Sequence, residues 1–295
     1  MGNRLIALAA ARACFGERPV QFRWINDASC PGNYHDLFDE TPNWSVCDTP
    51  SPGSTVIETH PWEPFSIFNS LDAHFSLGMT EREFAFRFIQ SLRSLPVRTA
   101  LNEKATAWRN NIQTRKLVGV HLRRTDRAAH HRQQFRAFLM RKQGLNRELP
   151  LYLNIMYGVL PQGMVHFVEN THIMNMIKKY GADKYAVFSD SMDGEASFSK
   201  MMRVGKIKKV VPVQDHDNQI VESNLRKTNI EDAMIELLCL SKCDAIAQSN
   251  RASTFSLVAA MIGGKPILTP ETRYPFYHAI KAKTGMPPIP PVLRG

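Results

Sequence analysis

The sequence predicts an α/β fold with a mainly parallel sheet in its second half. From residue 116 onward, short apolar runs alternate with segments of helical periodicity, which is the pattern of βαβ units. The chain has 295 residues, enough for two α/β domains or one large one, and its hydrophobic content of 43% predicts a sizeable core. We place a domain boundary near residue 115, which divides the chain into 1–115, 116–283 and a proline-rich tail over 284–295.

The first predicted element is a helix over residues 5–15, rich in alanine and leucine. It is closed by Gly16, a residue type that commonly follows the last helical turn. Residues 20–25 are a predicted strand. A doubly wound domain normally begins with a strand rather than a helix. One interpretation is therefore that Met1 is an internal methionine of a longer reading frame, and that the first strand is encoded upstream.

Two further helices are predicted before the boundary. Residues 26–78 are rich in Pro, Asn, Asp and aromatic residues, and we expect them to be irregular. Thr80 and Glu83 then form a capping box, a hydroxyl and a carboxylate three residues apart at a helix start. The helix that they open stops before Pro96, and a second helix over 101–112 leads into the second half.

The predicted elements of the second half alternate regularly. The predicted strands span 117–122, 151–156, 185–189, 209–213, 244–248 and 266–268. The predicted helices span 128–143, 165–180, 228–241, 255–262 and 269–283, the third of them opened by a capping box of Thr228 and Glu231. In open α/β sheets ligands bind outside the carboxyl ends of the strands, so polar residues that follow a strand are candidate site residues.

The charge balance favours an anionic partner. There are 37 Lys and Arg residues against 27 Asp and Glu, a net charge of +10 with His neutral. This balance fits a nucleotide, a phosphorylated lipid, a nucleic acid or a membrane surface. The five cysteines are odd in number and lack CxxC spacing, which favours a reduced intracellular protein. No apolar run of transmembrane length and no signal peptide is visible, so we expect a cytoplasmic location.

The first candidate site is the segment 116–127, KLVGVHLRRTDR. An apolar run delivers four polar side chains at its end: His121, Arg123, Arg124 and Asp126. Two guanidinium groups there can hold phosphate oxygens through rigid forks of N–H donors. The alternative is a surface ion-pair cluster in which Asp126 neutralises an arginine. The position at a strand end favours a ligand site.

The second candidate is Asp190, which follows the predicted strand 185–189. A carboxylate at this place can accept two hydrogen bonds from the ring N–H and the amino group of a guanine. The alternative is that Asp190 caps the next helix, which is the commoner use of Asp at a helix start.

Two further candidates lie where a helix is expected to begin. One follows the strand 244–248 and consists of Ser253, Thr254, Phe255 and Ser256. The N-terminus of a helix leaves unpaired N–H groups that bind phosphate, although an ordinary N-cap without a ligand has the same sequence pattern. The other is the start of the chain, Gly2, Asn3 and Arg4, where glycine permits close approach to a ligand. Its alternative is a disordered start.

Taken in this order and spacing, these segments resemble the superfamily of α1,6-, α1,2- and protein O-fucosyltransferases. VGVHLRRTD resembles the first motif of that superfamily, and YAVFSDS resembles the second. IEDAMIELLCLSKCDAIAQSNRASTFSLVAA resembles the third, and GNRLIALAAA resembles the N-terminal glycine-rich loop. The resemblance covers most of the second half and scattered pieces of the first.

The resemblance implies a GT-B fold, in which two Rossmann-like domains face each other across a cleft. It also implies inverting, metal-independent transfer of fucose from GDP-fucose. By position, Arg123 matches the arginine that contacts the donor β-phosphate, and Arg124 matches its basic neighbour. His121 and Asp190 match residues that hold the guanosine. The turn over 253–256 matches the part that binds the diphosphate, and Gly2, Asn3 and Arg4 match the glycine-rich loop.

The acceptor side departs from the family pattern. The α1,6 enzymes carry a glutamate shortly after the first motif as the proposed base, whereas residues 127–147 contain no acid. The alternatives are Asp126, His130, His131, and two acids of the first half, Asp36 and Glu58. We name Arg123 and Asp126 as the predicted catalytic residues.

The expected partners follow from this assignment. They are a nucleotide-sugar donor and a glycan or lipid-linked saccharide acceptor, the latter with a possible peripheral membrane contact. We expect no nucleic-acid partner, because the basic helix 128–143 lacks aromatic residues spaced for base stacking. Two alternatives remain open. One is a transferase for another GDP-linked sugar, and the other is a non-catalytic module that binds nucleotides or polyanions.

Overall fold

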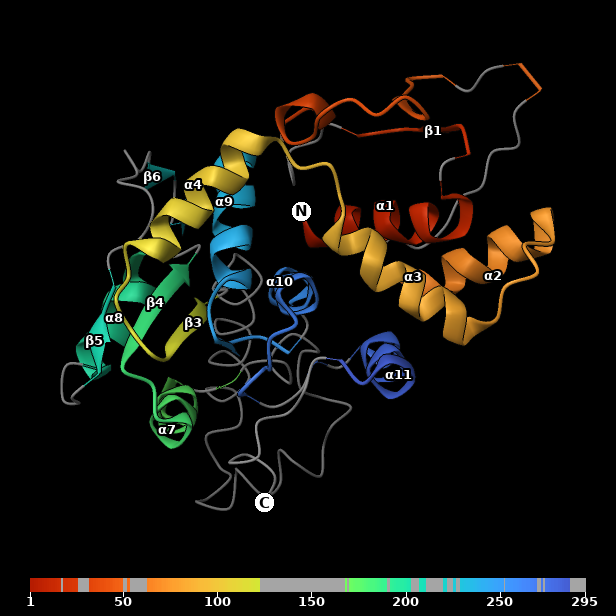
Figure 1. The fold of residues 1–295 in the computed structure, drawn as a ribbon. Coiled ribbons are helices and arrows are strands. Elements are labelled where there is room, and N and C mark those ends of the chain that lie inside the picture. The colour runs from red at the N-terminus through yellow and green to blue at the C-terminus, as the bar shows by residue number, and fades with distance from the viewer. Residues whose placement is uncertain are drawn as a thin grey trace, which may run out of the picture.

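A parallel sheet with helices on both faces dominates the second half of the chain (Figure 1). The computed structural model describes residues 1–16, 18–25, 32–49, 52–53, 63–122, 168, 170–189, 192–202, 207–210, 220–221, 225–226, 229–251, 253–269, 272 and 274–286.

The sheet contains four strands in the order β5-β4-β3-β8, and every neighbouring pair is parallel. The strands are β3 (Leu117–Leu122), β4 (Lys184–Ser189), β5 (Lys208–Lys209) and β8 (Ala245–Gln248). Every residue of β3 and β8 is buried, as expected for central strands of a sheet that is covered on both faces. The predicted α/β class with a parallel sheet is confirmed.

The two faces of the sheet are covered by different helices. On one face Val118 and Val120 share a core with α7 (Asn170–Tyr180) and α8 (Met192–Met202). On the other face Gly119 lies so close to α9 (Ile230–Ser241) that an added Cβ would stand 2.5 Å from Leu240 Cδ1. The chain order runs from β3 to β4 and β5, and then returns to β8 on the far side of β3. The boundary between β3 and β8 is therefore a topological switch point, where ligands bind in folds of this kind.

The first half is mainly helical in its described part. Its elements are α1 (Gly2–Phe15), β1 (Val20–Phe22), a 3₁₀ turn (Tyr34–Asp36), β2 (Trp44–Val46), α2 (Pro64–Phe75), α3 (Glu81–Arg93) and α4 (Thr99–Asn110). Strands β1 and β2 pair in parallel. The remaining elements of the second half are a short antiparallel pair, β6 (Ile220–Val221) and β7 (Leu225–Arg226), and two helices, α10 (Thr254–Gly263) and α11 (Pro275–Thr284).

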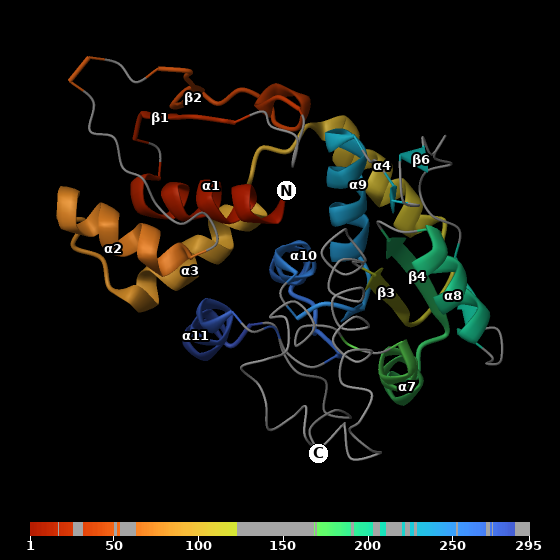
Figure 2. The ribbon, with the colours of Figure 1, turned by 180° about the vertical axis from the view of Figure 1, so that it is seen from behind.

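One hydrophobic core joins the two halves. It contains residues of α1, α2, α3 and α4 together with residues of α9, α10 and α11. Helix α4 lies along α9, and α10 lies beside α1 and α3, as both ribbon views show (Figure 2). The helices next to the sheet are thus also packed against the first half. The domain boundary near residue 115 and the division into two Rossmann-like domains stay predictions.

Several predicted elements are confirmed with small changes at their ends. Thr80 caps α3 by accepting a hydrogen bond from the Glu83 amide at 3.2 Å, and the helix ends at Arg93, before Pro96. The helix expected over 5–15 is α1, which begins earlier, at Gly2. Helix α10 begins at Thr254 and ends before Gly264, which has a left-handed backbone.

Other predictions are wrong. Helix α2 lies in a segment that we expected to be irregular. The surrounding Pro-rich sequence outweighed the helical signals, which are Pro64 in the first turn and the apolar residues Ile67, Phe68 and Leu71. The last helix begins at Pro275, not at residue 269. The cap of α9 is Asn229, which accepts a hydrogen bond from the Asp232 amide at 2.7 Å, so the capping pair is shifted by one residue from the predicted one. The strand expected over 266–268 is reduced to one bridge, between Ile246 and Ile267.

Candidate functional site

The candidate site is built around the N-terminus of α10. Ser253 is the N-cap of this helix, and its hydroxyl oxygen accepts a hydrogen bond from the Ser256 amide at 3.4 Å. Ser253 and Ser256 are both fully buried, and Thr254 is nearly so. The helix itself consists of small and apolar residues, which lets its first turn pack closely against neighbouring segments. The first turn therefore presents backbone N–H groups in a buried environment, where a negative charge is favoured.

His121 supports this turn from the sheet. It lies near the carboxyl end of β3, is 9% exposed, and its Nδ1 stands 2.6 Å from Ser256 Oγ and 3.2 Å from Ser253 Oγ. Its ring stacks on Phe255 with a centroid distance of 4.9 Å and an interplanar angle of 26°. The imidazole of His121 thus contacts the turn. Its assignment to the guanosine of a donor stays a prediction.

The start of α1 reaches the same turn. A Cβ added to Gly2 would stand 2.7 Å from both the carbonyl carbon and Oγ1 of Thr254, so no side chain fits at position 2 without a shift of the backbone. The N-terminus lies beside α9 and α10 in both views (Figures 1 and 2). Two helix N-termini, each carrying about half a positive charge, therefore meet at one place.

The start of the chain is helical, not a loop. Gly2, Asn3 and Arg4 form the first turn of α1, which corrects the expectation of a glycine-rich loop. The Arg4 guanidinium lies over the Trp24 ring at 5.0 Å from its centroid. The first turn of α1 thus connects the α10 turn to the aromatic residues that follow β1.

Four predicted site residues lie outside the described residues: Arg123, Arg124, Asp126 and Asp190. The strands that precede them are described, and their last residues, Leu122 and Ser189, are register partners on neighbouring strands. In the sequence, positions 123 and 190 therefore directly follow the ends of two neighbouring strands. Their roles stay predictions.

Of the alternative bases, only Asp36 lies among the described residues. Glu58, His130 and His131 lie outside the described residues. Asp36 is described, and one oxygen of its carboxylate accepts a hydrogen bond from the Asn33 amide at 2.6 Å. This contact is a capping interaction at the 3₁₀ turn, which gives Asp36 a local structural use.

Sequence reasoning missed Gln248, the last residue of β8. It is fully buried and is the register partner of His121 across the switch point. The signal was present in the sequence as a long polar side chain at the end of the apolar run AIAQ, directly before the segment that leads to the 253–256 turn.

Three of the four described cysteines, Cys14, Cys239 and Cys243, are poor candidates for nucleophiles. Cys14, Cys47, Cys239 and Cys243 are free thiols. Burial, together with the nearby negative charge of Asp72, raises the pKa of Cys14 to about 12. Burial likewise holds the pKa of Cys239 and Cys243 well above the usual range, so their thiolates are scarce at neutral pH.

Among the described residues, no three His, Cys, Asp or Glu side chains gather as metal ligands. In the same part of the chain, no helix is long and apolar enough to cross a membrane.

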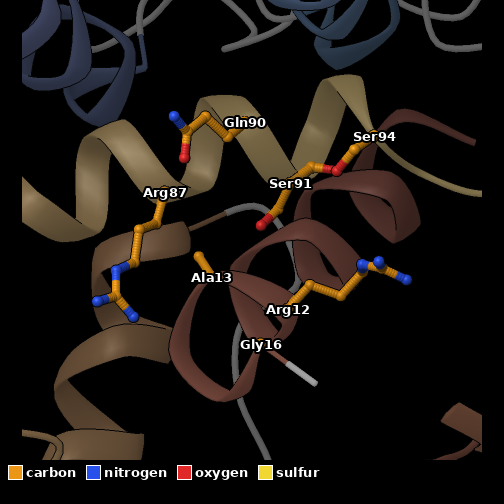
Figure 3. A pocket seen from close by; sticks show the side chains of 7 residues that line it. All are labelled: Arg12, Ala13, Gly16, Arg87, Gln90, Ser91 and Ser94. Carbon is orange, nitrogen blue, oxygen red and sulfur yellow. The ribbon is translucent and has the colours of Figure 1, made fainter. Parts of the chain in front are cut away.

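A cavity of about 300 Å³ lies between α1 and α3, away from the α10 turn (Figure 3). Its polar lining includes Arg12, Arg87 and Ser91. The two guanidinium groups extend in different directions in Figure 3, and Arg87 is paired with Glu83 at 2.6 Å. This arrangement does not converge on one anion, and we assign no ligand to it.

Comparison with known proteins gives structural neighbours only. No family model and no curated protein sequence matches the chain. The fucosyltransferase NodZ from Bradyrhizobium is 13% identical with a TM-score of 0.46, covering 90% of this chain and 91% of that chain. NodZ alpha-1,6-fucosyltransferase soaked with GDP-fucose is 12% identical with a TM-score of 0.44, covering 90% of each chain.

A third neighbour is POFUT1 in complex with GDP, which is 14% identical with a TM-score of 0.37 over 61% of this chain. The chain spans 50% of the length of that POFUT1 structure. All three TM-scores are below 0.5.

Proposed function

We propose that the chain is an inverting, metal-independent glycosyltransferase that transfers fucose from GDP-fucose to a hydroxyl of a glycan or a lipid-linked saccharide. One observation carries this proposal. Three segments that lie far apart in the sequence and resemble donor-binding motifs meet around the first turn of α10: Gly2, His121 and the turn over 253–256. Their meeting point is the carboxyl end of β3, beside the switch point, where α/β folds bind nucleotides.

The diphosphate of the donor is assigned to this meeting point. The first turns of α10 and α1 supply N–H groups and the positive ends of two helix dipoles. Arg123 directly follows β3, next to His121, and is our candidate for the side chain that binds the β-phosphate. Fixed positive charge in a buried place has a low reorganisation cost, which makes it effective in stabilising an anionic leaving group.

The reaction follows from that charge distribution. The acceptor oxygen attacks the anomeric carbon of fucose from the face opposite GDP, and the bond from that carbon to the β-phosphate oxygen breaks. GDP leaves with the electron pair, and its growing charge is stabilised by Arg123 and the helix N-termini. The acceptor proton passes to a base, for which Asp126 is our candidate, since it is the acid that follows β3 most closely.

The remaining parts of the proposal concern the guanine, the acceptor and the location of the protein. We assign guanine to Asp190, which directly follows β4. We assign the acceptor to the first half, with the two halves arranged as in a GT-B enzyme. We place the protein in the cytoplasm, where a lipid-linked acceptor would bring it to a membrane surface that its net charge of +10 favours.

Calorimetry tests the proposal. GDP, UDP and GDP-fucose are titrated into the full chain with and without EDTA, and GDP release is then followed as candidate acceptors are added. We expect guanine-selective binding that EDTA does not change, and GDP release that requires an acceptor. Equal affinity for UDP and GDP would contradict the role of Asp190.

The net charge of +10 favours one rival, a non-catalytic module that binds polyanions. It predicts salt-sensitive binding to many anionic polymers without a preference for guanine, because phosphate contacts carry no base information. GDP-mannose and other GDP-linked sugars in the same titration separate fucose from the alternative donors.

A further inference from the structure

Gln248 carries an unsatisfied hydrogen-bonding group at the switch point. Its side chain is 0% exposed, and neither Oε1 nor Nε2 has a hydrogen-bond partner in the described part of the chain. An unpaired buried amide is costly, and such a group in a native fold usually marks an unseen water or ligand. Its backbone amide, in contrast, donates to Thr269 Oγ1 at 3.0 Å.

The location of Gln248 directs this side chain to the candidate site. Along β8, Ala245 and Ala247 belong to the core on the α7 and α8 face, whereas Ile246 belongs to the core on the α9 and α10 face. Because successive strand residues alternate in direction, Gln248 lies on the α9 and α10 face. It is the register partner of His121, whose imidazole contacts the α10 turn.

Asn3 and Arg251, which lie close in sequence to the N-termini of α1 and α10, also carry buried polar atoms without partners among the described residues. Asn3, in the first turn of α1, has a buried Oδ1 without a partner among the described residues. Arg251, in the link between β8 and α10, has a buried Nε without a partner in the same part of the chain. These two residues thus belong to the first turn of α1 and to the segment just before α10, the two helices whose N-termini meet.

The chemistry of these atoms selects the kind of ligand group. Gln248 Nε2 and Arg251 Nε donate hydrogen bonds, whereas Gln248 Oε1 and Asn3 Oδ1 accept them. An ionised phosphate only accepts and leaves the two oxygens unpaired. A sugar hydroxyl both donates and accepts, so it matches an amide that offers one group of each kind.

We propose that Gln248 is a specificity-determining residue of the donor site, and that its amide exchanges hydrogen bonds with hydroxyl groups of the nucleotide sugar. This inference rests on the proposed function. The proposed donor carries such hydroxyl groups on its ribose and on its transferred sugar. Both carry the same hydroxyl chemistry, and the experiment separates them.

The test compares the wild type with Gln248→Met, which keeps the length of the side chain and removes both hydrogen-bonding groups. Thermal unfolding is measured without ligand, and GDP and GDP-fucose affinities are measured by calorimetry. We expect the ligand-free melting temperature to stay the same or rise, because a buried unsatisfied amide is removed. We expect the affinity for GDP-fucose to fall about ten-fold. Gln248→Leu is the second variant if the methionine variant does not fold.

The control is Ser199→Ala on α8. The Ser199 hydroxyl is also buried without a partner among the described residues, but α8 covers the opposite face of the sheet. This variant should keep wild-type affinity for both ligands. It thereby separates an effect at the donor site from the general effect of removing a buried polar atom.

The outcomes are distinct. An equal loss for GDP and GDP-fucose supports a contact with the ribose, and a loss for GDP-fucose alone supports a contact with the transferred sugar. Unchanged affinity in Gln248→Met overturns the proposal, and a lower melting temperature together with unchanged affinity identifies a trapped water as the partner. A wild type that binds neither nucleotide overturns the proposed function and this assignment together.

Discussion

His121 shows how one buried side chain can organise a turn. Its imidazole is held between the hydroxyls of Ser253 and Ser256 on one side and the ring of Phe255 on another. These contacts fix the first turn of α10 relative to the end of β3. A preformed turn loses little conformational entropy when a phosphate binds, which favours tight binding of a leaving group.

Arg123→Ala tests the residue that follows β3. We expect turnover to fall about 10²- to 10³-fold, the effect of removing one donor that stabilises transition-state charge, with little change in unfolding free energy. The matched control is Arg115→Ala. Arg115 is exposed and lies just before the start of β3, so this variant should keep full activity. Steady-state kinetics and urea unfolding are the measurements. Wild-type turnover in Arg123→Ala would show that the diphosphate is bound elsewhere.

At the scale of elements, the N-cap of α10, Ser253, has two roles. Its hydroxyl stabilises the helix and also takes part in the network with His121. Helix α3 has an ordinary cap of the same chemical type, in which Thr80 accepts from the Glu83 amide on an exposed part of the surface. The pair allows the structural and functional uses of a cap to be measured separately.

Ser253→Ala and Thr80→Ala are therefore compared. Each should lower the free energy of unfolding by about 1 kcal/mol, because each removes a hydroxyl that caps a helix. Only Ser253→Ala should also weaken GDP binding, since its cap adjoins the candidate site. The measurements are urea unfolding and calorimetry. If both variants bind GDP with wild-type affinity, the α10 turn is only a structural cap.

The elements also differ in how well their sequences predicted them. Helix α3 has a cap, apolar residues at helical spacing and a proline beyond its end, and each of these signals acts within a few residues. Helix α2 has a comparable apolar spacing, but it lies between segments rich in proline and aromatic residues that favoured an irregular interpretation. The start of α11 was misplaced because Thr269 and Pro270 offer the same local start signal as Tyr274 and Pro275.

At the scale of the whole molecule, the first half is tied to the sheet by specific polar contacts as well as by the shared core. Arg109 of α4 pairs with Asp244 at 3.3 Å and donates to the Lys242 carbonyl oxygen at 3.1 Å. The Asp244 carboxylate also accepts from the Leu117 amide at 2.8 Å, at the start of β3. One carboxylate thus links α4, β3 and the turn before β8.

Asp244→Ala tests this link. We expect the free energy of unfolding to fall by about 2 kcal/mol, because the change leaves Arg109 without its charge partner and removes a charge-assisted hydrogen bond to a backbone amide. The control is Arg87→Ala, which breaks an exposed ion pair with Glu83 and should cost less than about 0.5 kcal/mol. Urea unfolding at neutral pH measures both. Equal costs in the two variants would show that the link contributes little.

The sequence by itself determined the parts of this protein that depend on near neighbours in the chain. The alternation of apolar runs predicted the parallel sheet, and the Thr80 and Ser253 caps marked helix starts. Such signals are local because backbone hydrogen bonds and caps join residues three or four positions apart.

Only the tertiary structure decided which of these residues meet. It placed Gly2 against Thr254 and brought His121 into contact with the hydroxyls of the α10 turn. It also buried the Gln248 amide at the switch point. These contacts join residues more than a hundred positions apart, and they depend on how the helices pack on the sheet. The local sequence places a polar residue at the end of β8, but it does not encode the packing that buries this residue, because that packing involves distant segments of the chain.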